Sequence, residues 1–162
     1  MMGVVLAGGQ SRRMGQDKAM LRHANGQTWL ARSIELLGEV CDEVWVSGRT
    51  GARGIIDPQP FAGPAAAIVH CCQILDDDIL FIPVDLPLLT IETLRELCHH
   101  TADAVHYANH PLPLLMIGAK KRVENINAPQ NMSVYQLLAG LNVHQITPNP
   151  SQIIALTNVN YP

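Results

Sequence analysis

A chain of 162 residues with 48% hydrophobic and 15% charged residues is long enough for one globular domain with a substantial core. A net charge of −3 leaves no basic footprint for duplex nucleic acid, and no apolar stretch reaches membrane-spanning length. The apolar residues 1–7 are too few for a signal peptide and lack a basic front end. We therefore expect a cytoplasmic protein that binds neither nucleic acid nor membrane.

Strands and helices are predicted to alternate along the first hundred residues. Apolar runs bounded by turn residues predict the strands, and apolar residues at helical spacing, such as Leu30, Ile34 and Leu37, predict the helices. In chain order the expected elements are strand 3–7, helix 27–38, strand 43–47, strand 54–57, helix 64–75, strand 78–84 and a helix that follows an N-cap at Thr90. This order predicts an α/β fold with a mainly parallel sheet covered by helices on both faces.

The residues after position 101 show a less regular pattern. They predict a loop over 125–131 and a short helix over 133–139. Candidate strands lie near 103–107, 113–118, 143–146 and 152–156. Because no linker or repeat interrupts the chain, we expect a single domain over 1–162.

The segment Leu6-Ala-Gly-Gly-Gln-Ser-Arg-Arg-Met-Gly-Gln-Asp-Lys18 follows the first predicted strand. Gly8 and Gly9 have no Cβ atom, so their backbone can turn sharply and approach a ligand closely. Consecutive amide N–H groups in such a turn form an anion site, to which Arg12, Arg13 and Lys18 add positive charge. A solvated glycine turn is the plainer alternative, but the clustered charges favour a phosphate-binding loop.

Two common phosphate loops do not match this segment. The Walker loop requires four residues between its glycines and a hydroxyl residue after its lysine, whereas five residues separate Gly9 from Gly15 and Ala19 follows Lys18. The dinucleotide fingerprint G-x-G-x-x-G is also absent. The segment therefore indicates another class of nucleotide-binding protein.

Asp85 follows the most apolar predicted strand, in the run Phe81-Ile-Pro-Val-Asp-Leu-Pro-Leu-Leu89. Ligands of open α/β sheets bind at the carboxyl ends of the strands, where Asp85 and the phosphate loop would meet. A carboxylate beside a triphosphate suits one ligand of Mg²⁺, although it could instead cap a turn. Asp57 ends another predicted strand and could contact a nucleoside or cap a turn.

Other polar residues and the cysteines favour structural interpretations. Residues 76–78 form an acidic run expected in a solvated loop, and the histidines at 99, 100, 106 and 110 are expected at the surface. Cys71 and Cys72 lie on a predicted apolar helix face and are expected as small buried hydrophobic residues of a reduced protein.

Several segments resemble the motifs of molybdenum cofactor guanylyltransferases and follow one another in the same order. These segments are Leu6-Ala-Gly-Gly9, Arg13-Met-Gly15, Asp17-Lys18, Gly63-Pro-Ala-Ala-Ala67, Pro83-Val-Asp-Leu-Pro87 and Asn158-Val-Asn160. The resemblance implies a Rossmann-like nucleotidyltransferase fold that transfers GMP from GTP to the phosphate of molybdopterin, with Mg²⁺ as the cofactor. The Leu-Ala-Gly-Gly form resembles that of the GTP-using members.

The resemblance also implies residue roles. Leu6, Ala7, Gly8 and Gly9 would line the nucleotide, Lys18 and Arg13 would stabilise the phosphates, and Asp57 would lie on the guanosine side. Asp85 would bind Mg²⁺, whereas Asn158 and Asn160 would lie near the pterin. Residues 1–100 would then form the nucleotide- and metal-binding part, and 101–162 the acceptor side. Other cofactor-biosynthesis proteins and apo-molybdoenzymes are implied as further partners.

The chain departs from the family pattern at several places, including the stretch Gln130-Asn-Met-Ser-Val134, where an arginine-bearing stretch is expected. It reads Val46-Ser-Gly-Arg49 where the family often has an Asn, and Ala67 replaces the second glycine of the G-P-L-A-G segment. These departures leave two alternatives open. One is a related nucleotidyltransferase that uses CTP or a sugar phosphate, and the other is a non-catalytic nucleotide-binding paralogue.

Overall fold

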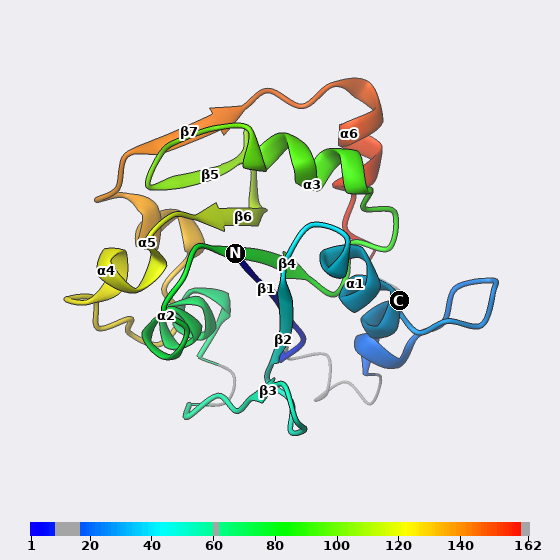
Figure 1. Cartoon of the computed structure of the whole chain (residues 1–162), viewed down its shortest axis with the longest axis horizontal. Coiled ribbons are helices and arrows are strands. Elements are labelled where there is room, and N and C mark those ends of the chain that lie inside the picture. The colour runs from blue at the N-terminus through cyan, green and yellow to red at the C-terminus, as the bar shows by residue number, and fades with distance from the viewer. Residues whose placement is uncertain (9–16, 60–61, 160–162) are drawn as a thin grey trace.

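The computed structural model describes residues 1–8, 17–59 and 62–159, and its centre is one seven-stranded sheet in the order β3-β2-β1-β4-β6-β5-β7 (Figure 1). The strands are β1 (Met2–Leu6), β2 (Glu43–Ser47), β3 (Gly54–Ile55), β4 (Ile79–Pro83), β5 (Ala104–Tyr107), β6 (His110–Met116) and β7 (Val143–Ile146). The helices are η2 (Lys18–Met20), α1 (Trp29–Gly38), α2 (Pro64–Ile74), α3 (Ile91–Cys98), α4 (Ala119–Val123), α5 (Val134–Leu138) and α6 (Pro150–Ala155).

The sheet is mixed, but β6 is the strand that runs against its neighbours. Strands β3, β2, β1 and β4 pair in parallel, as do β5 and β7, whereas β6 is antiparallel to both β4 and β5. The predicted mainly parallel sheet is therefore confirmed.

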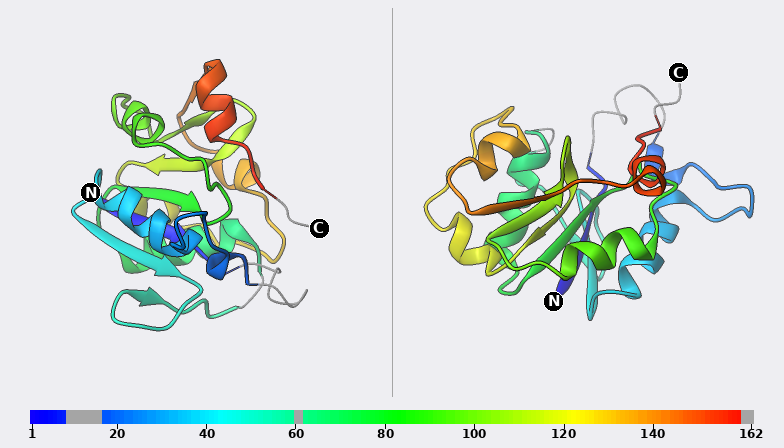
Figure 2. Two further views of the ribbon diagram at one scale, coloured as in Figure 1. Left: turned by 90° about the vertical axis from the view of Figure 1, so that its right-hand side faces the viewer. Right: turned by 90° about the horizontal axis from the view of Figure 1, so that it is seen from above.

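Helices cover both faces of the sheet because its central strands are apolar on both sides. Val4 packs with the buried residues of α2, α4 and α5, whereas its neighbour Val5 packs with those of α1 and α3 on the opposite face. Figure 2 shows these two helical layers on either side of the strands. Among the described helices, none combines the length and the apolar character needed to cross a bilayer.

The predicted elements of the first hundred residues are all present, with one error in a helix face. Ile34 of α1 was predicted to face the core but is 37% exposed, and Trp29, Ser33, Leu36 and Leu37 are buried instead. Trp29, directly after the N-cap Thr28, packs into the core, and this rotates the buried stripe away from Ile34.

The second half corrects one predicted strand and adds a helix. Residues 152–156 were predicted as a strand, but α6 occupies this region. Asn149 caps α6, Pro150 occupies its first turn and Gln152 completes a capping box, so local capping overrides the apolar pair Ile153–Ile154. Short helices η2 and α4 were not predicted, whereas the loop over 125–131 and the helix near 133–139 are confirmed.

Candidate functional site

Three neighbouring parallel strands end at one edge of the sheet. Leu6, the last residue of β1, lies opposite Ser47 of β2 and Pro83 of β4. The Ala7 amide donates to the Ser47 carbonyl at 3.1 Å, and the Val84 amide donates to the Leu6 carbonyl at 3.3 Å. The segments that follow the three strands are therefore held side by side, as expected for a ligand site in an open α/β sheet.

A cleft of about 810 Å³ opens at this edge, and both halves of the chain line it. The first half contributes Leu6, Ala7, Gly8, Asp17, Lys18, Ala19, Ser47, Gly63, Pro64, Ala67, Pro83, Val84, Asp85 and Leu86. The second half contributes His110, Pro111, Leu112, Asn131, Met132, Ser133, Val134, Tyr135, Leu156 and Asn158. Most of the predicted site residues that the structure describes thus share one cleft.

Lys18 and Asp85 meet in this cleft although 67 residues separate them. The Lys18 Nζ atom donates to Asp85 Oδ2 at 3.3 Å, and the Asn158 amide donates to the same oxygen at 2.8 Å. The side chains of Lys18 and Asp85 are 23% and 20% exposed, so both are reachable from the cleft while partly shielded from bulk water. The predicted juxtaposition of the lysine and the acid is confirmed.

The C-terminal segment reaches Asp85 because α6 is anchored to the core. The Gln152 side chain donates to the Tyr107 hydroxyl at 3.1 Å, and Leu156 is buried. Beyond the helix, the Val159 amide donates to the Asp85 carbonyl at 3.2 Å. Asn158 is thereby placed against the Asp85 carboxylate, where it contacts the acid directly; its predicted acceptor-side role stays a prediction.

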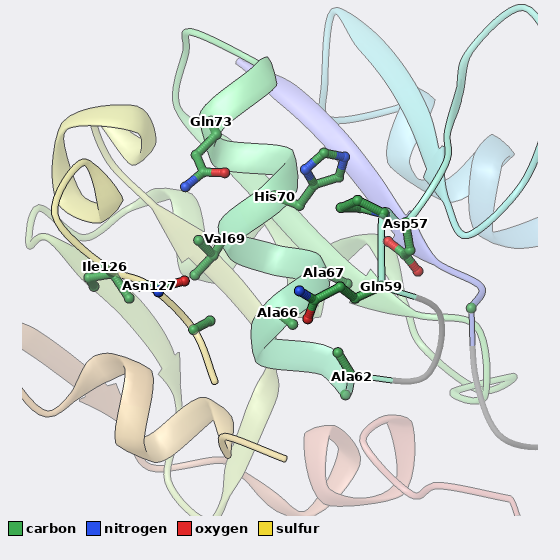
Figure 3. A pocket seen from close by; sticks show the side chains of 14 residues that line it. Asp57, Gln59, Ala62, Ala66, Ala67, Val69, His70, Gln73, Ile126 and Asn127 are labelled. Atoms are coloured by element: carbon green, nitrogen blue, oxygen red, sulfur yellow. The ribbon is translucent and has the colours of Figure 1, made fainter. Parts of the chain in front are cut away.

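Asp57 lies beside the cleft in a smaller pocket of about 190 Å³ that shares Gly8, Gly63 and Ala67 with it (Figure 3). The pocket follows one side of α2, and Figure 3 shows Asp57 and His70 at its edge. The Ser47 hydroxyl donates to Asp57 Oδ1 at 3.2 Å. Burial raises the pKa of Asp57, while the Ser47 hydrogen bond and the nearby His70 act in the opposite direction.

Ser47 lines the cleft and Arg49 contacts the lining residue Asp17, although the sequence predicted neither. Ser47 is the last residue of β2 and Arg49 follows the strand. The Arg49 Nη2 atom lies 2.6 Å from each carboxylate oxygen of Asp17. The departure at Val46-Ser-Gly-Arg49 was the available signal, because it follows a strand that ends at the same edge as β1. The predicted residues Gly9, Arg12, Arg13 and Asn160 lie outside the described part of the chain.

Comparisons with known proteins identify the family. Residues 3–146 match the family described as the MobA-like NTP transferase domain. The chain is 34% identical to the molybdenum cofactor guanylyltransferase of Xanthomonas euvesicatoria, with 99% of this chain and 89% of that protein covered. It is also 30% identical to the probable molybdenum cofactor guanylyltransferase of Rhodopirellula baltica, with 100% and 88% covered.

The chain belongs to the molybdenum cofactor guanylyltransferase family.

The solved structures agree on the fold of this family. The molybdopterin-guanine dinucleotide biosynthesis protein A of Archaeoglobus fulgidus superposes with a TM-score of 0.76 at 19% identity, covering 100% of this chain and 93% of that one. This similarity confirms the predicted nucleotidyltransferase fold of the guanylyltransferase family. The resemblance inferred from the sequence motifs is confirmed as well.

One prediction for a polar residue outside the cleft was wrong. His106 was expected at the surface but is 1% exposed, because its Nδ1 atom donates to the carbonyls of Tyr107 at 2.8 Å and His110 at 3.2 Å and so organises the turn that leads into the cleft wall. The acidic run at 76–78 lies in a loop and is at least partly exposed, as predicted, and within it Asp78 accepts from the Gly118 amide at 2.7 Å and Asp77 pairs with the N-terminal amine.

The cysteines behave as predicted. Cys71 and Cys72 are buried in the core, and burial raises the pKa of the Cys71 thiol to about 12. A thiol with that pKa stays protonated at neutral pH, so it is a poor nucleophile. All four cysteines of the chain are free thiols.

The residues present fit a cation that is bound partly by the protein and partly by the phosphates of a nucleotide. In the described ranges no group of three or more His, Cys, Asp or Glu side chains is arranged to hold a metal ion. Asp85 offers one partly exposed carboxylate in the cleft. Mg²⁺ in nucleotide sites is commonly bound by one or two carboxylates, substrate phosphates and water, so this donor set is compatible with it.

The Asp57→Asn substitution is expected to stabilise the folded protein at neutral pH. Because burial raises the pKa of Asp57, the folded state binds its proton more readily, and wild-type stability falls as the pH rises through the window above about pH 4. Asparagine removes this cost and can still accept from Ser47. Thermal unfolding should show the gain at pH 7 and its disappearance near pH 4; a gain that is constant with pH would contradict this account.

Proposed function

We propose that the protein transfers GMP from GTP to the phosphate of molybdopterin, releasing pyrophosphate and forming molybdopterin guanine dinucleotide. The observation that carries the proposal is the contact of Lys18 with Asp85 in a cleft at the carboxyl ends of β1 and β4. The family membership supports the same substrates. We also propose a cytoplasmic site of action, which the free cysteine thiols support.

The reaction asks this chain chiefly for positioning and charge stabilisation. A molybdopterin phosphate oxygen attacks the α-phosphorus of GTP, forming one P–O bond while the bond to the β-phosphate oxygen breaks. Because the attacking group is already an anion, no strong general base is needed. We assign to Lys18 and Arg13 the stabilisation of the negative charge that develops on pyrophosphate, and the position of Lys18 beside Asp85 supports this role.

Asp85 is the residue we assign to Mg²⁺. The bound cation would supply charge neutralisation of the phosphates at the reacting centre. Asp85 contributes a carboxylate whose Oδ2 atom is oriented by Asn158 at 2.8 Å and by Lys18. This orientation supports a fixed carboxylate position before the nucleotide arrives, which reduces the reorganisation needed during the reaction.

The guanosine side is proposed at Asp57. A carboxylate accepts hydrogen bonds, and the N1–H and N2–H₂ groups of guanine present donors side by side. Gly8 lies against Asp57, since a Cβ atom built on Gly8 would lie 2.8 Å from Asp57 Oδ2. A base held there would leave its phosphates near Gly8 and Lys18, which line the larger cleft. Leu6, Ala7 and Gly9 are proposed to line the nucleotide as well.

We propose that the acceptor binds to the part of the cleft that residues 101–162 line. Residues 1–100 would then bind the nucleotide and the metal. His110, Pro111 and Tyr135 come from the second half and line the cleft. The Tyr135 ring is 46% exposed and packs edge-on against the buried His106, with the ring centroids 5.8 Å apart. An exposed ring held from behind offers a flat surface on which a pterin can stack.

The Tyr135→Ala variant is therefore expected to raise the KM for molybdopterin about tenfold and leave the KM for GTP unchanged, because stacking on an aromatic ring contributes about 1–3 kcal/mol per base. Steady-state kinetics with each substrate varied in turn measures both constants. The Tyr135→Phe variant keeps the ring and should behave as the wild type. Equal increases in both KM values would argue against an acceptor-specific role.

Incubation of the protein with GTP, Mg²⁺ and molybdopterin tests the proposed function directly. Chromatography should detect the guanine dinucleotide, and pyrophosphate release should require GTP in a panel with ATP, CTP and UTP. Preference for CTP would reject the base assignment and favour a related cytidylyltransferase. Binding of GTP without any dinucleotide or pyrophosphate would favour a non-catalytic nucleotide-binding protein.

A further inference from the structure

The segment Ser47–Gly48–Arg49 contacts three parts of the nucleotide site with three consecutive residues. The Ser47 hydroxyl donates to Asp57 at 3.2 Å, on the proposed base side. The Gly48 backbone lies against Gly8, since a Cβ built on Gly48 would lie 2.4 Å from the Gly8 Cα atom. Arg49 pairs with Asp17, the residue before Lys18. This segment therefore aligns elements that are distant in the sequence.

The ion pair of Arg49 with Asp17 is shielded from water. Arg49 Nη2 contacts both carboxylate oxygens of Asp17 at 2.6 Å, and the two side chains are 17% and 28% exposed. The Arg49 Nε atom is buried without a hydrogen-bond partner in the described structure. By contrast, the pair of Arg53 with Glu43 is 50% and 43% exposed and is open to solvent screening.

Asp17 connects Arg49 to Lys18, because it contacts Arg49 and also caps the helix that begins at Lys18. Its Oδ1 atom also accepts from the Ala19 amide at 3.2 Å, and this contact caps the short helix η2 that begins at Lys18. Lys18 in turn contacts Asp85, which accepts from Asn158. A continuous series of polar contacts therefore runs from Arg49 across the cleft to the C-terminal segment.

The charge of Arg49 also matters because Asp17 lines the cleft. A carboxylate at this position repels the anionic phosphates of a nucleotide. Arg49 sits on the carboxylate and offsets its charge, while leaving the Lys18 amine directed at Asp85. Removal of Arg49 would expose the phosphates to an unpaired negative charge and release the helix that carries Lys18.

We propose that Arg49 is a positioning residue for nucleotidyl transfer: through Asp17 it fixes Lys18 and neutralises a carboxylate that would otherwise repel the triphosphate. This inference rests on the proposed function, since it assigns the phosphates of GTP to the cleft. It extends that function to a residue that touches neither the Lys18 amine nor Asp85.

The test compares Arg49→Met with the matched control Arg53→Met, which removes an arginine from the same region but leaves the cleft intact. Arg49→Met should raise the KM for GTP about tenfold, in the range of measured pairwise couplings, and leave the KM for molybdopterin unchanged. Arg53→Met should leave both constants as in the wild type. Arg49→Lys keeps the positive charge but cannot contact both carboxylate oxygens of Asp17 in the same way. Its KM for GTP should therefore lie between those of the wild type and Arg49→Met.

A double variant separates positioning from plain loss of structure. If Arg49 acts through Asp17, adding Asp17→Asn to Arg49→Met removes the unpaired carboxylate and should recover part of the GTP affinity, as measured by titration calorimetry and by kinetics. The double variant also lacks the unpaired, partly buried charge of Asp17, so it provides a second folded protein if Arg49→Met unfolds. Additive losses in the double variant, or a KM for GTP in Arg49→Met equal to that of Arg53→Met, would overturn the inference. A wild type that binds no GTP would instead reject the proposed function.

Discussion

The Asp85→Ala variant is expected to lose at least about a hundredfold in kcat, because single groups that stabilise charge in a transition state contribute effects of about this size. The substitution removes the proposed cation ligand. It also removes the oxygen that accepts from both Lys18 and Asn158, so the contact that joins the lysine to this side of the cleft is lost. Pyrophosphate release at saturating GTP and molybdopterin measures the effect.

Two further variants make the Asp85 result interpretable. Asp85→Asn keeps the shape of the side chain but halves its acceptor capacity and removes its charge, so it should fold normally and still lose most of the turnover. Asp76→Ala removes an acid that is 79% exposed and pairs with Lys120, so its kcat should stay close to wild type. Turnover within about threefold of wild type in Asp85→Ala would reject the assigned role of this carboxylate.

The sequence predicted the part of the site that depends on strand order. Because parallel strands end at one edge of a sheet, the segment after β1 and the acid after β4 were expected to lie close together. The Lys18 Nζ atom indeed lies 3.3 Å from Asp85 Oδ2. The motifs predicted the same pair through the family. Asp57 likewise lies beside Gly8, because the chain leaves β3 at the same edge of the sheet as it leaves β1, with the parallel strand β2 between them.

The contacts that the sequence did not predict depend on how loops and side chains pack. Arg49 reaches Asp17 only because Gly48 brings the end of β2 against Gly8, and no periodicity encodes such a contact. The strand predicted over 152–156 is helix α6, because the cap at Asn149 starts a helix that carries the apolar pair Ile153–Ile154. Both features depend on local geometry that the apolar pattern of a sequence does not encode.

The Gly48→Ala variant is expected to lower the free energy of unfolding by at least about 2 kcal/mol, because it combines a left-handed backbone with a steric collision. Gly48 has φ +80°, and a Cβ atom there would lie 2.4 Å from the Gly8 Cα atom and 2.7 Å from the Gly8 nitrogen. Both are backbone atoms, so no side-chain rotation relieves the contact. The end of β2 must move away from the loop that starts at Gly8.

Gly26→Ala is the matched control for this variant. Gly26 has φ +84°, nearly the same backbone conformation, but a Cβ atom there would meet nothing within 4 Å. Denaturant unfolding of the two variants should therefore show a larger loss for Gly48→Ala, and the difference measures the contact with Gly8. GTP affinity from titration should fall about tenfold or more in Gly48→Ala and stay unchanged in Gly26→Ala, because displacement of a positioning element weakens binding steeply. Equal stability losses would mean that backbone strain accounts for the whole effect, and the close packing of Gly48 on Gly8 would then have no energetic role.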